Sequence, residues 1–521
     1  MDKKISNLTK STMALVIFAL VGKFLGFGRQ MLIANYFGAG VETDAFTTAL
    51  KATSLLSAIV SNAIANTFIP MLAKVRANEG SGGLSKHTNN MLFISILIAA
   101  IMSTVGYFFA PTIVQIVGGG FGVETYVLAV ELTKIGMPVI MFSAIVGVMT
   151  GYLQSEGRFA ATGAIPIPLN MVYIGYLILL SSTFGIYGMS VASVLGVVAQ
   201  AIFLFPETRK AGLKYFPVFD LKDKYVMHAL KLSLPVLLSV AINDINIIVN
   251  TRLASGLESG TVTWLDQANK LNVMILGIFV SAVTAVVFPI LSKNFSSGDV
   301  EGGRKSMASS VRLIMLITIP AMVGLMVLAQ PIVEIAFMRG EFTQYAADMT
   351  AQALVFYALA LCAMSLNNLL NRVYYSLQDT RTPVIIGGFS VLLNITFNLI
   401  LIRFLGHRGL ALGLSLATNI AVFTSFVVLK KKLKNFYGFS YLRALIKNLI
   451  AAILMGIVAY YSYFGVVALV PSMGVGTVRK LIVLLFAVFN SVITYGGVSY
   501  LLGVGEVKML VEMIKDKLKK N

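Results

Sequence analysis

Residues 22–46, GKFLGFGRQMLIANYFGAGVETDAF, decide how the rest of the chain is interpreted. The stretch begins inside an apolar segment that runs from Thr12 to about Leu32. That segment is long enough to cross a bilayer, which takes about 20 residues. It nevertheless holds two cations, Lys23 and Arg29. A cation at membrane depth costs about 2.5–3.5 kcal/mol on insertion scales, so each one needs water or an anionic partner.

Three glycines accompany these cations, at positions 22, 26 and 28. Glycine lets a neighbouring helix or a ligand approach the backbone closely. Two interpretations follow from the residues alone. The segment either lines an aqueous, ligand-binding space, or it forms a tight helix contact while its cations reach to the cytoplasmic edge of the membrane.

The composition is that of a polytopic membrane protein. The chain has 521 residues, of which 57% are hydrophobic and only 12% are charged, and its mean hydropathy is +0.85. Soluble domains have about 25% charged residues. The net charge of +19 is typical of basic cytoplasmic loops beside anionic lipid, rather than of a nucleic-acid-binding protein. The single cysteine, Cys362, excludes an intramolecular disulfide.

The apolar segments predict an all-α protein with about fourteen transmembrane helices. The first follows a basic N-terminus without a small-residue cleavage site, so we expect a retained helix rather than a signal peptide. The predicted segments lie near 12–32, 43–67, 90–110, 125–153, 160–183, 187–206, 227–251, 262–291, 307–329, 346–371, 382–402, 409–429, 443–466 and 480–503.

Lysine and arginine decide the predicted orientation, because cytoplasmic loops carry an excess of them. With both termini in the cytoplasm, that side holds clusters such as 430–434 and 515–520. The outer side then holds only Arg252, Arg339, Arg403, Arg408, Arg479 and Lys480. We therefore expect a multi-pass protein with both termini in the cytoplasm.

The chain repeats itself at an offset of about 219 residues. This shift places Lys51 on Lys270 and Pro70 on Pro289, and it aligns 113–116 (IVQI) with 332–335 (IVEI). The offset drifts to 221–223 further along, as small loop insertions produce. We expect two parallel six-helix repeats followed by two extra helices. The predicted divisions are 1–215 for the N-terminal lobe, 216–436 for the C-terminal lobe, and 437–521 for helices 13 and 14 with a basic tail.

The repeat relates two of the intramembrane cations, Lys51 and Lys270. If the halves face one another, these lysines meet across a central space, where a pyrophosphate would supply the missing negative charge. Asp266 lies four residues before Lys270, so a structural ion pair is the alternative. Arg372 either lines the cavity or reaches to the membrane edge.

Enzyme and metal motifs are missing from the sequence. It has no phosphate-binding P-loop, no H-E-x-x-H and no G-x-S-x-G motif. The three histidines, His87, His228 and His407, are far apart, so they predict no metal site. We expect neither catalysis, nor a metal, nor a cofactor. The loop that contains Asp379 and Thr380 is expected to cap the following helix, with Pro383 in its first turn.

Several stretches resemble the lipid II flippases of the MurJ (MviN) type, within the multidrug/oligosaccharidyl-lipid/polysaccharide exporter superfamily. The stretches are LGFGRQMLIANYFGAG..TDAF (25–46), NTFIPMLAK (66–74), VFPILSK (287–293), FMRGEFT (337–343), YYSLQDTRTP (374–383) and GHRGLALGLSLATN (406–419). The resemblance covers essentially the whole chain in order. It implies fourteen helices in two six-helix lobes, a cationic central cavity, and a lipid-tail groove formed by the last two helices.

The resemblance also implies a set of site residues. Arg29 matches the family's essential first-helix arginine and Asp44 its TDAF aspartate, while Lys23 and Lys270 stand where many members have arginine. The substrate pyrophosphate is expected at Arg29, Lys23, Lys51 and Lys270, with Asp44, Asn62, Asp266 and Arg372 in support. The chain departs from the family pattern at Gln30, Ser57, Ala58, Asn62 and Asn368.

The function that this resemblance implies is transport of the undecaprenyl-pyrophosphate-linked peptidoglycan precursor from the inner to the outer leaflet by alternating access. The expected location is the bacterial cytoplasmic membrane, among membrane lipids, with the cell-wall synthesis machinery as a candidate partner and no nucleic acid. A flippase for another polyprenyl-linked oligosaccharide, of the O-antigen or capsule type, is the alternative. A drug/cation antiporter and a non-transporting envelope scaffold are the more remote ones.

Overall fold

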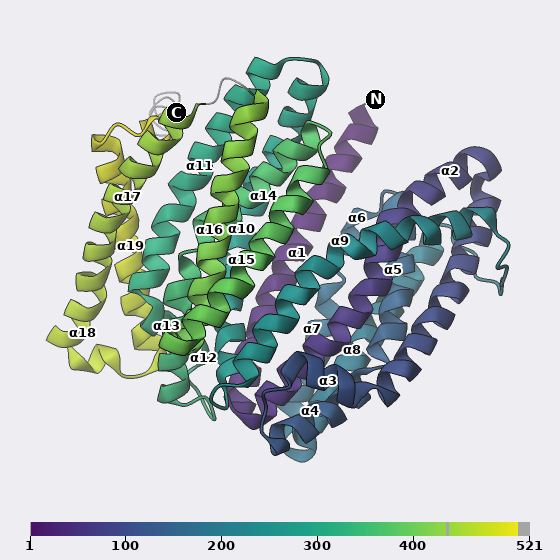
Figure 1. Ribbon diagram of the computed structural model, residues 1–521, viewed down its shortest axis with the longest axis horizontal. Coiled ribbons are helices and arrows are strands. Elements are labelled where there is room, and N and C mark those ends of the chain that lie inside the picture. The colour runs from purple at the N-terminus through teal and green to yellow at the C-terminus, as the bar shows by residue number, and fades with distance from the viewer. Residues whose placement is uncertain (1, 434–436, 509–521) are drawn as a thin grey trace. The chain divides into compact units, whose positions relative to one another are not determined.

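Helices make up all the regular structure in the described part of the chain (Figure 1). The computed structural model describes residues 2–433 and 437–508, and their side chains outside 2–16, 59–60, 62–66, 233–243, 278–288 and 473–474. The helices before residue 260 are α1 (Asp2–Phe37), α2 (Val41–Phe108), α3 (Ala110–Gly118), α4 (Val123–Gly136), α5 (Val139–Ser155), α6 (Phe159–Gly163), α7 (Pro166–Leu179), α8 (Ser181–Lys210) and α9 (Lys224–Ser255).

The remaining helices continue the same pattern. They are α10 (Thr261–Ser296), α11 (Val300–Val327), α12 (Ala329–Phe337), α13 (Gln344–Ala358), α14 (Leu361–Ser376), α15 (Arg381–Leu405), α16 (His407–Leu433), α17 (Gly438–Tyr460), α18 (Val466–Leu469) and α19 (Thr477–Leu501). A π-helical turn, Tyr461–Gly465, joins α17 to α18, and a 3₁₀ turn, Pro471–Gly474, precedes α19.

The predicted all-α membrane fold is confirmed. Nine helices of the described residues are long and apolar enough to cross a membrane, or up to eleven if each of two bent pairs is one span. The predicted segments 43–67, 227–251 and 262–291 overlap side-chain ranges that are not described. The number fourteen therefore stays a prediction.

The sequence repeat is visible in the helices themselves. The aligned IVQI and IVEI motifs lie in α3 and α12, which are both nine residues long and start 219 positions apart. The pairs α4–α5 and α13–α14 bend by 42° and 45°. Gly185 and Gly406, which lie 221 positions apart, share an unusual backbone conformation, with φ 52°, ψ −146° and φ 55°, ψ −131°. These positive φ values favour glycine, so the repeat preserves backbone geometry as well as hydrophobic pattern.

Packing divides the chain into two compact units, Met1–Thr263 with Arg339–Phe342, and Trp264–Met338 with Thr343–Asn521. The lobe boundaries expected from the repeat stay a prediction. In unit 1, α2 and α5 share a core that includes Phe68, Leu72, Ile140 and Tyr152. The short helices α3 and α4 are drawn close together in Figure 1 and contact each other.

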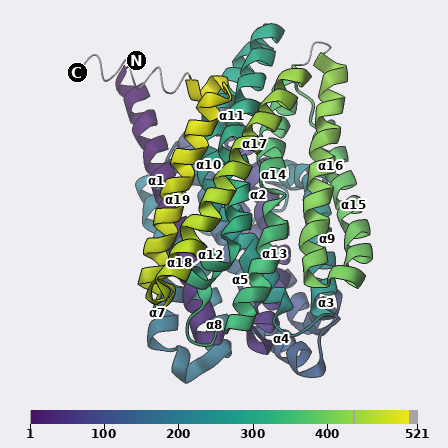
Figure 2. The same ribbon diagram turned by 90° about the vertical axis from the view of Figure 1, so that its left-hand side faces the viewer.

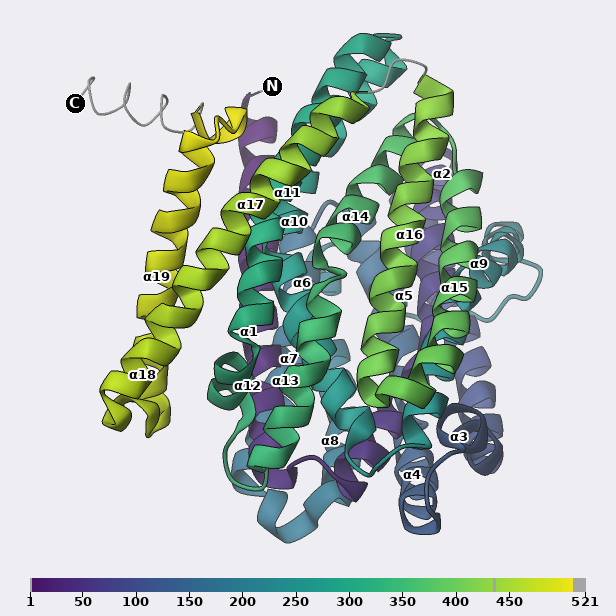
Figure 3. The ribbon, with the colours of Figure 1, turned by 60° about the vertical axis from the view of Figure 1, so that its left-hand side comes forward.

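The two C-terminal helices belong to unit 2. Helix α17 packs on α11 and contributes Tyr441, Ala444 and Ala452 to a core shared with α11, α14 and α16. Figures 2 and 3 show α17 and α19 side by side, joined at α18. Arg312 of α11 pairs with Glu506, just after α19, and donates to the Ser440 hydroxyl at 3.2 Å. Arg312 therefore ties the last helices to α11.

Two glycines allow the 339–342 segment to pack against the end of α1. Gly38 and Gly340 have φ values of +61° and +53°. A Cβ on Gly38 would collide with the Glu341 carbonyl, and one on Gly340 with the Asn35 carbonyl. The Glu341 N–H donates to the Asn35 carbonyl at 3.0 Å. The YFGAG and RGEF stretches therefore interlock, and both require glycine.

Candidate functional site

The glycine face of α1 packs against α7. A Cβ on Gly22 would lie 2.9 Å from the Pro166 side chain, and one on Gly26 would meet Asn170 at 3.7 Å. The Asn170 amide donates to the Gly22 carbonyl at 3.2 Å. Residues spaced by three and four lie on one face of a helix. Gly22 and Gly26 therefore make the close helix contact that was one of the two interpretations left open by the sequence, while a Cβ on Gly28 would meet no atom within 4 Å.

Arg29 lies one turn further along the same face. Its guanidinium lies over the ring of Tyr173 on α7, 4.7 Å from the ring centroid. The Nε atom is buried without a hydrogen-bond partner. Within the described part of the chain, no carboxylate forms an ion pair with Arg29. Lys23 lies on a more exposed part of α1.

The contact with the Tyr173 ring is too weak to offset the free-energy cost of placing Arg29 in the membrane. A cation–π contact contributes about 0.5–2 kcal/mol. A cation at membrane depth costs about 2.5–3.5 kcal/mol. Water or an anion must supply the difference, so Arg29 is suited to receive the negative charge of a ligand.

Asp44 has a structural environment that the sequence did not reveal. Its carboxylate is buried and accepts from the N–H of Gly260 at 2.7 Å and the N–H of Thr263 at 2.8 Å. The Thr263 hydroxyl also donates to it, at 2.6 Å. These groups lie at the N-terminal end of α10, where helices leave unpaired N–H groups that attract a carboxylate. The structure thus gives Asp44 a role at the start of α10, and its role at a ligand site stays a prediction.

The two repeat-related lysines lie in different units. Lys51 is half-buried on α2 in unit 1. Lys270, on α10 in unit 2, pairs with Asp266 one turn before it. The structural ion pair considered from the sequence is therefore present. That Lys51 and Lys270 meet across a shared space stays a prediction.

The other predicted supporting residues are Arg372 and Asn62. Arg372 is half-buried on α14, and the Asn62 side chain lies outside the described residues. Lys134 of α4 lies three residues after Glu131, a helical spacing at which the two could form an ion pair. The structure places its ammonium over the Tyr107 ring instead, 5.5 Å from the centroid, while Glu131 accepts from the Tyr187 hydroxyl at 2.5 Å.

The loop before α15 behaves as the sequence predicted. The Asp379 carboxylate accepts from the N–H of Thr382 at 3.0 Å, and Pro383 lies in the first turn of α15. Burial tends to raise the pKa of Asp379, but the Lys432 ammonium and the Thr382 contacts outweigh it and hold that pKa well below its usual range. The loop is therefore tied to α16 as well as to α15.

His87 belongs to a cluster that the sequence did not reveal. Its Nδ1 lies 2.6 Å from the Asp223 carboxylate and its Nε2 lies 2.9 Å from Glu79. The Asn90 amide donates to Asp223 at 2.9 Å. Burial tends to raise the pKa of Asp223, and the hydrogen bonds from Asn90 and His87 outweigh it, so that pKa is lowered. The cluster fastens the segment before α9 to α2.

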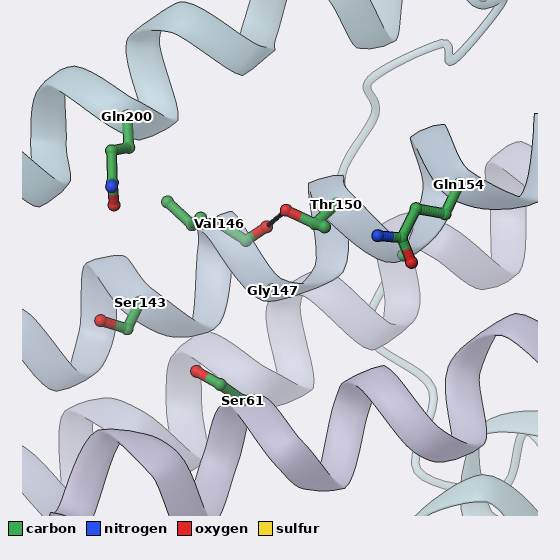
Figure 4. A pocket seen from close by; sticks show the side chains of 8 residues that line it. Ser61, Ser143, Val146, Gly147, Thr150, Gln154 and Gln200 are labelled. Carbon is green, nitrogen blue, oxygen red and sulfur yellow. Dashed lines mark hydrogen bonds between the residues drawn. The ribbon is translucent and has the colours of Figure 1, made fainter. Parts of the chain in front are cut away.

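A pocket of about 300 Å³ lies in unit 1 among α2, α5 and α8. Figure 4 shows its lining residues, which are Ser61, Ser143, Val146, Gly147, Thr150, Gly151, Gln154 and Gln200. None of them is charged, and none was singled out from the sequence. The available signal was the recurrence of small and polar residues every three or four positions along the apolar α5.

Comparisons with known proteins identify relatives along almost the whole chain. The family model described as lipid II flippase MurJ matches residues 33–489. A probable lipid II flippase MurJ of Vibrio cholerae is 30% identical over 442 residues, covering 82% of this chain and 83% of that protein. One from Buchnera aphidicola subsp. Acyrthosiphon pisum is 28% identical over 504 residues, covering 96% and 98%.

The solved structures show the same fold. A structure described as lipid II flippase MurJ in an inward closed conformation matches with a TM-score of 0.76 at 24% identity, covering 92% of this chain and 98% of that one. An inward-facing multidrug resistance MATE family transporter of the MOP superfamily matches with a TM-score of 0.66 at 14% identity, covering 81% and 98%.

Proposed function

The chain belongs to the lipid II flippase MurJ family, and we propose that it moves lipid II from the inner to the outer leaflet by alternating access. The match along 33–489 and the multi-pass helical fold support a transporter rather than an enzyme. The repeat, with its matched bends, supports alternating access, in which two similar halves move against each other.

Among the individual residues, Arg29 gives this proposal its main support. It is a partly buried cation over an aromatic ring, and no carboxylate of the described residues pairs with it. A pyrophosphate supplies the charge that this site lacks, and a guanidinium can hold two of its oxygens at once. Lys23, Lys51 and Lys270 are proposed to add positive charge, with Asp44, Asn62, Asp266 and Arg372 in support.

The orientation and location follow from the distribution of basic residues. We infer that both termini lie in the cytoplasm and that the protein lies in the bacterial inner membrane, where lipid II is flipped toward the outer leaflet. The cell-wall synthesis machinery, which uses lipid II, is the proposed partner. The substrate's lipid tail is proposed to stay beside α17 and α19.

Complementation tests the function. A bacterial host depleted of its own lipid II flippase is expected to grow when this chain is expressed, and to stop growing with Arg29→Ala expressed at the same level. If the wild-type chain inserts normally but leaves the depleted cells unable to grow, lipid II is not its substrate. The flippase for another polyprenyl-linked oligosaccharide then becomes the preferred function.

A further inference from the structure

We propose that the pocket lined by Ser61, Ser143, Thr150, Gln154 and Gln200 binds an uncharged sugar or amide group of the substrate headgroup. This inference rests on the proposed function and names a second, neutral subsite beside the cationic one. We call it the neutral pocket. It lies entirely within unit 1, between α2, α5 and α8.

The chemistry of the lining selects the class of ligand. Five of the eight lining residues contribute a hydroxyl or a carboxamide, and none of the eight is acidic or basic. A pyrophosphate finds no counter-charge there, and neither does a cation. Sugar hydroxyls and amides both donate and accept hydrogen bonds, as serine hydroxyls and glutamine amides do. The neutral pocket therefore complements an uncharged polar group.

Several of these polar groups are available to a ligand. Within the described residues, the Ser61 and Ser143 hydroxyls and the Gln154 amide have no hydrogen-bond partner in the protein, and all three side chains are only partly buried. The Thr150 hydroxyl donates to the Val146 carbonyl at 2.6 Å, which leaves its lone pairs free to accept. Figure 4 shows Ser61, Ser143 and Gln200, from three helices, extending into one space.

The size of the pocket suits part of a headgroup. Its volume of about 300 Å³ lies at the lower end of the range for ligand sites, which is about 300–1,000 Å³. Along α5 the lining runs from Ser143 to Gln154, about 16 Å at 1.5 Å per residue. Gly147 contributes no side chain to the middle of that stripe. The Phe68 ring occupies the space beside Gly151. One or two sugar rings match this elongated shape better than a whole headgroup does.

The first turn of α7 connects the neutral pocket to the part of α1 that holds Lys23 and Arg29. Gln200 donates from its amide to the Ile165 carbonyl at 3.1 Å. The next residue, Pro166, is the one that packs on Gly22 of α1. Lys23 follows directly, and Arg29 lies two turns further on. One substrate can therefore place its pyrophosphate on α1 and an adjoining uncharged ring in the pocket.

The experiment compares two ligands that differ only in the headgroup beyond the pyrophosphate. Native mass spectrometry of the full-length protein would measure binding of lipid II and of undecaprenyl pyrophosphate. The variant Ser143→Ala/Gln154→Leu removes two polar groups from the pocket. Because a net hydrogen bond changes an equilibrium severalfold, we expect binding of lipid II to fall about tenfold. Binding of undecaprenyl pyrophosphate should stay unchanged, which also reports that the variant is folded.

A matched pair of threonine variants provides the control. Thr150 and Thr104 both donate to the carbonyl four residues earlier, but Thr104 lies on an exposed face of α2 away from the pocket. Thr150→Val should weaken lipid II selectively, and Thr104→Val should weaken neither ligand.

Two results would overturn this inference and leave the proposed function standing. In the first, the pocket variants bind lipid II as tightly as the wild type does, which means that the pocket holds only water. In the second, the pocket variants lose binding of both ligands equally. If the wild-type protein binds undecaprenyl pyrophosphate no more weakly than lipid II, the pocket adds nothing to recognition and the inference is also wrong. A wild-type protein that binds neither ligand would instead overturn the proposed function, and this inference with it.

Discussion

The Asp44 carboxylate accepts hydrogen bonds from both the backbone N–H and the hydroxyl of Thr263, a residue that lies 219 positions later in the chain. This separation equals the offset of the sequence repeat, so each residue occupies the position that corresponds to the other. The second repeat has threonine where the first has aspartate. The substitution converts two equivalent positions into an acceptor and a donor at the start of α10.

Removing the Asp44 carboxylate should destabilise the protein. Asp44→Ala leaves the Gly260 and Thr263 N–H groups without their partner in a site where Asp44 is 1% exposed. Each unsatisfied buried group costs about 1–3 kcal/mol. We expect a clear drop in the melting temperature of the purified protein. Thr263→Val, which removes one hydroxyl bond only, should cause a smaller drop. Equal melting curves for Asp44→Ala and wild type would contradict this role.

Arg29→Ala should abolish transport while membrane abundance stays near normal. The reason is that, within the described residues, no carboxylate is left unpaired by the change. Arg29→Lys should keep part of the activity, because it retains the charge but loses the two-pronged geometry. Arg209, whose guanidinium lies 4.5 Å from the Phe205 ring centroid, is the matched control. Arg209→Ala should leave growth in the depletion strain unchanged. If Arg29→Ala supported growth, Arg29 would not be part of the substrate site.

Variants of Lys270 and Asp266 can distinguish a structural role of the Lys270 charge from a role in substrate binding. The Lys270 side chain is 39% exposed, and an ion pair of this spacing is worth only about 0.2–0.5 kcal/mol. Lys270→Ala should therefore leave stability almost unchanged, and a large loss of transport would come from substrate binding. The exchanged variant Lys270→Asp/Asp266→Lys keeps the pair but moves the cation by one turn. Recovery of full transport in that variant would favour the purely structural role.

The predicted orientation is testable with single cysteines in a Cys362→Ala background. Ser81 and Val123 are both exposed, Val123 at 81%. Ser81→Cys should react only with membrane-permeant thiol reagents, and Val123→Cys should also react with impermeant ones. Gly119 is unsuitable for this purpose, because a side chain there would collide with Arg252. The reverse labelling pattern would invert both the topology and the proposed direction of transport.

Lowering the pH should destabilise the attachment of the segment before α9 to α2. The folded-state pKa of Asp223 is lowered, since the hydrogen bonds from Asn90 and His87 outweigh the effect of burial. A lowered pKa contributes stability above the unfolded value of about 3.9, and that contribution is lost as the pH falls through the folded value. Melting temperatures measured between neutral pH and about pH 3 should fall less steeply for Asp223→Asn. Asp220→Asn, at an exposed position three residues before the buried Asp223, should keep the wild-type slope.

The sequence by itself determined the class of fold and the repeat. Apolar run lengths, the lysine and arginine distribution and the 219-residue offset are local or periodic properties of the chain. They predicted an all-helical membrane protein whose helices repeat, and α3 and α12 begin at the matching positions. The cap of α15 by Asp379 was predictable for the same reason, because its partner Thr382 is three residues away.

Only the tertiary structure decided which side chains meet. Tyr173 lies beneath Arg29, Glu506 reaches Arg312, and Thr263 completes the surroundings of Asp44. Each of these contacts joins residues more than a hundred positions apart. The neutral pocket likewise needs α2, α5 and α8 to be packed together before its hydroxyls and amides share one space. Helical periodicity fixes which face a residue occupies, but the partner of that face depends on how the helices pack.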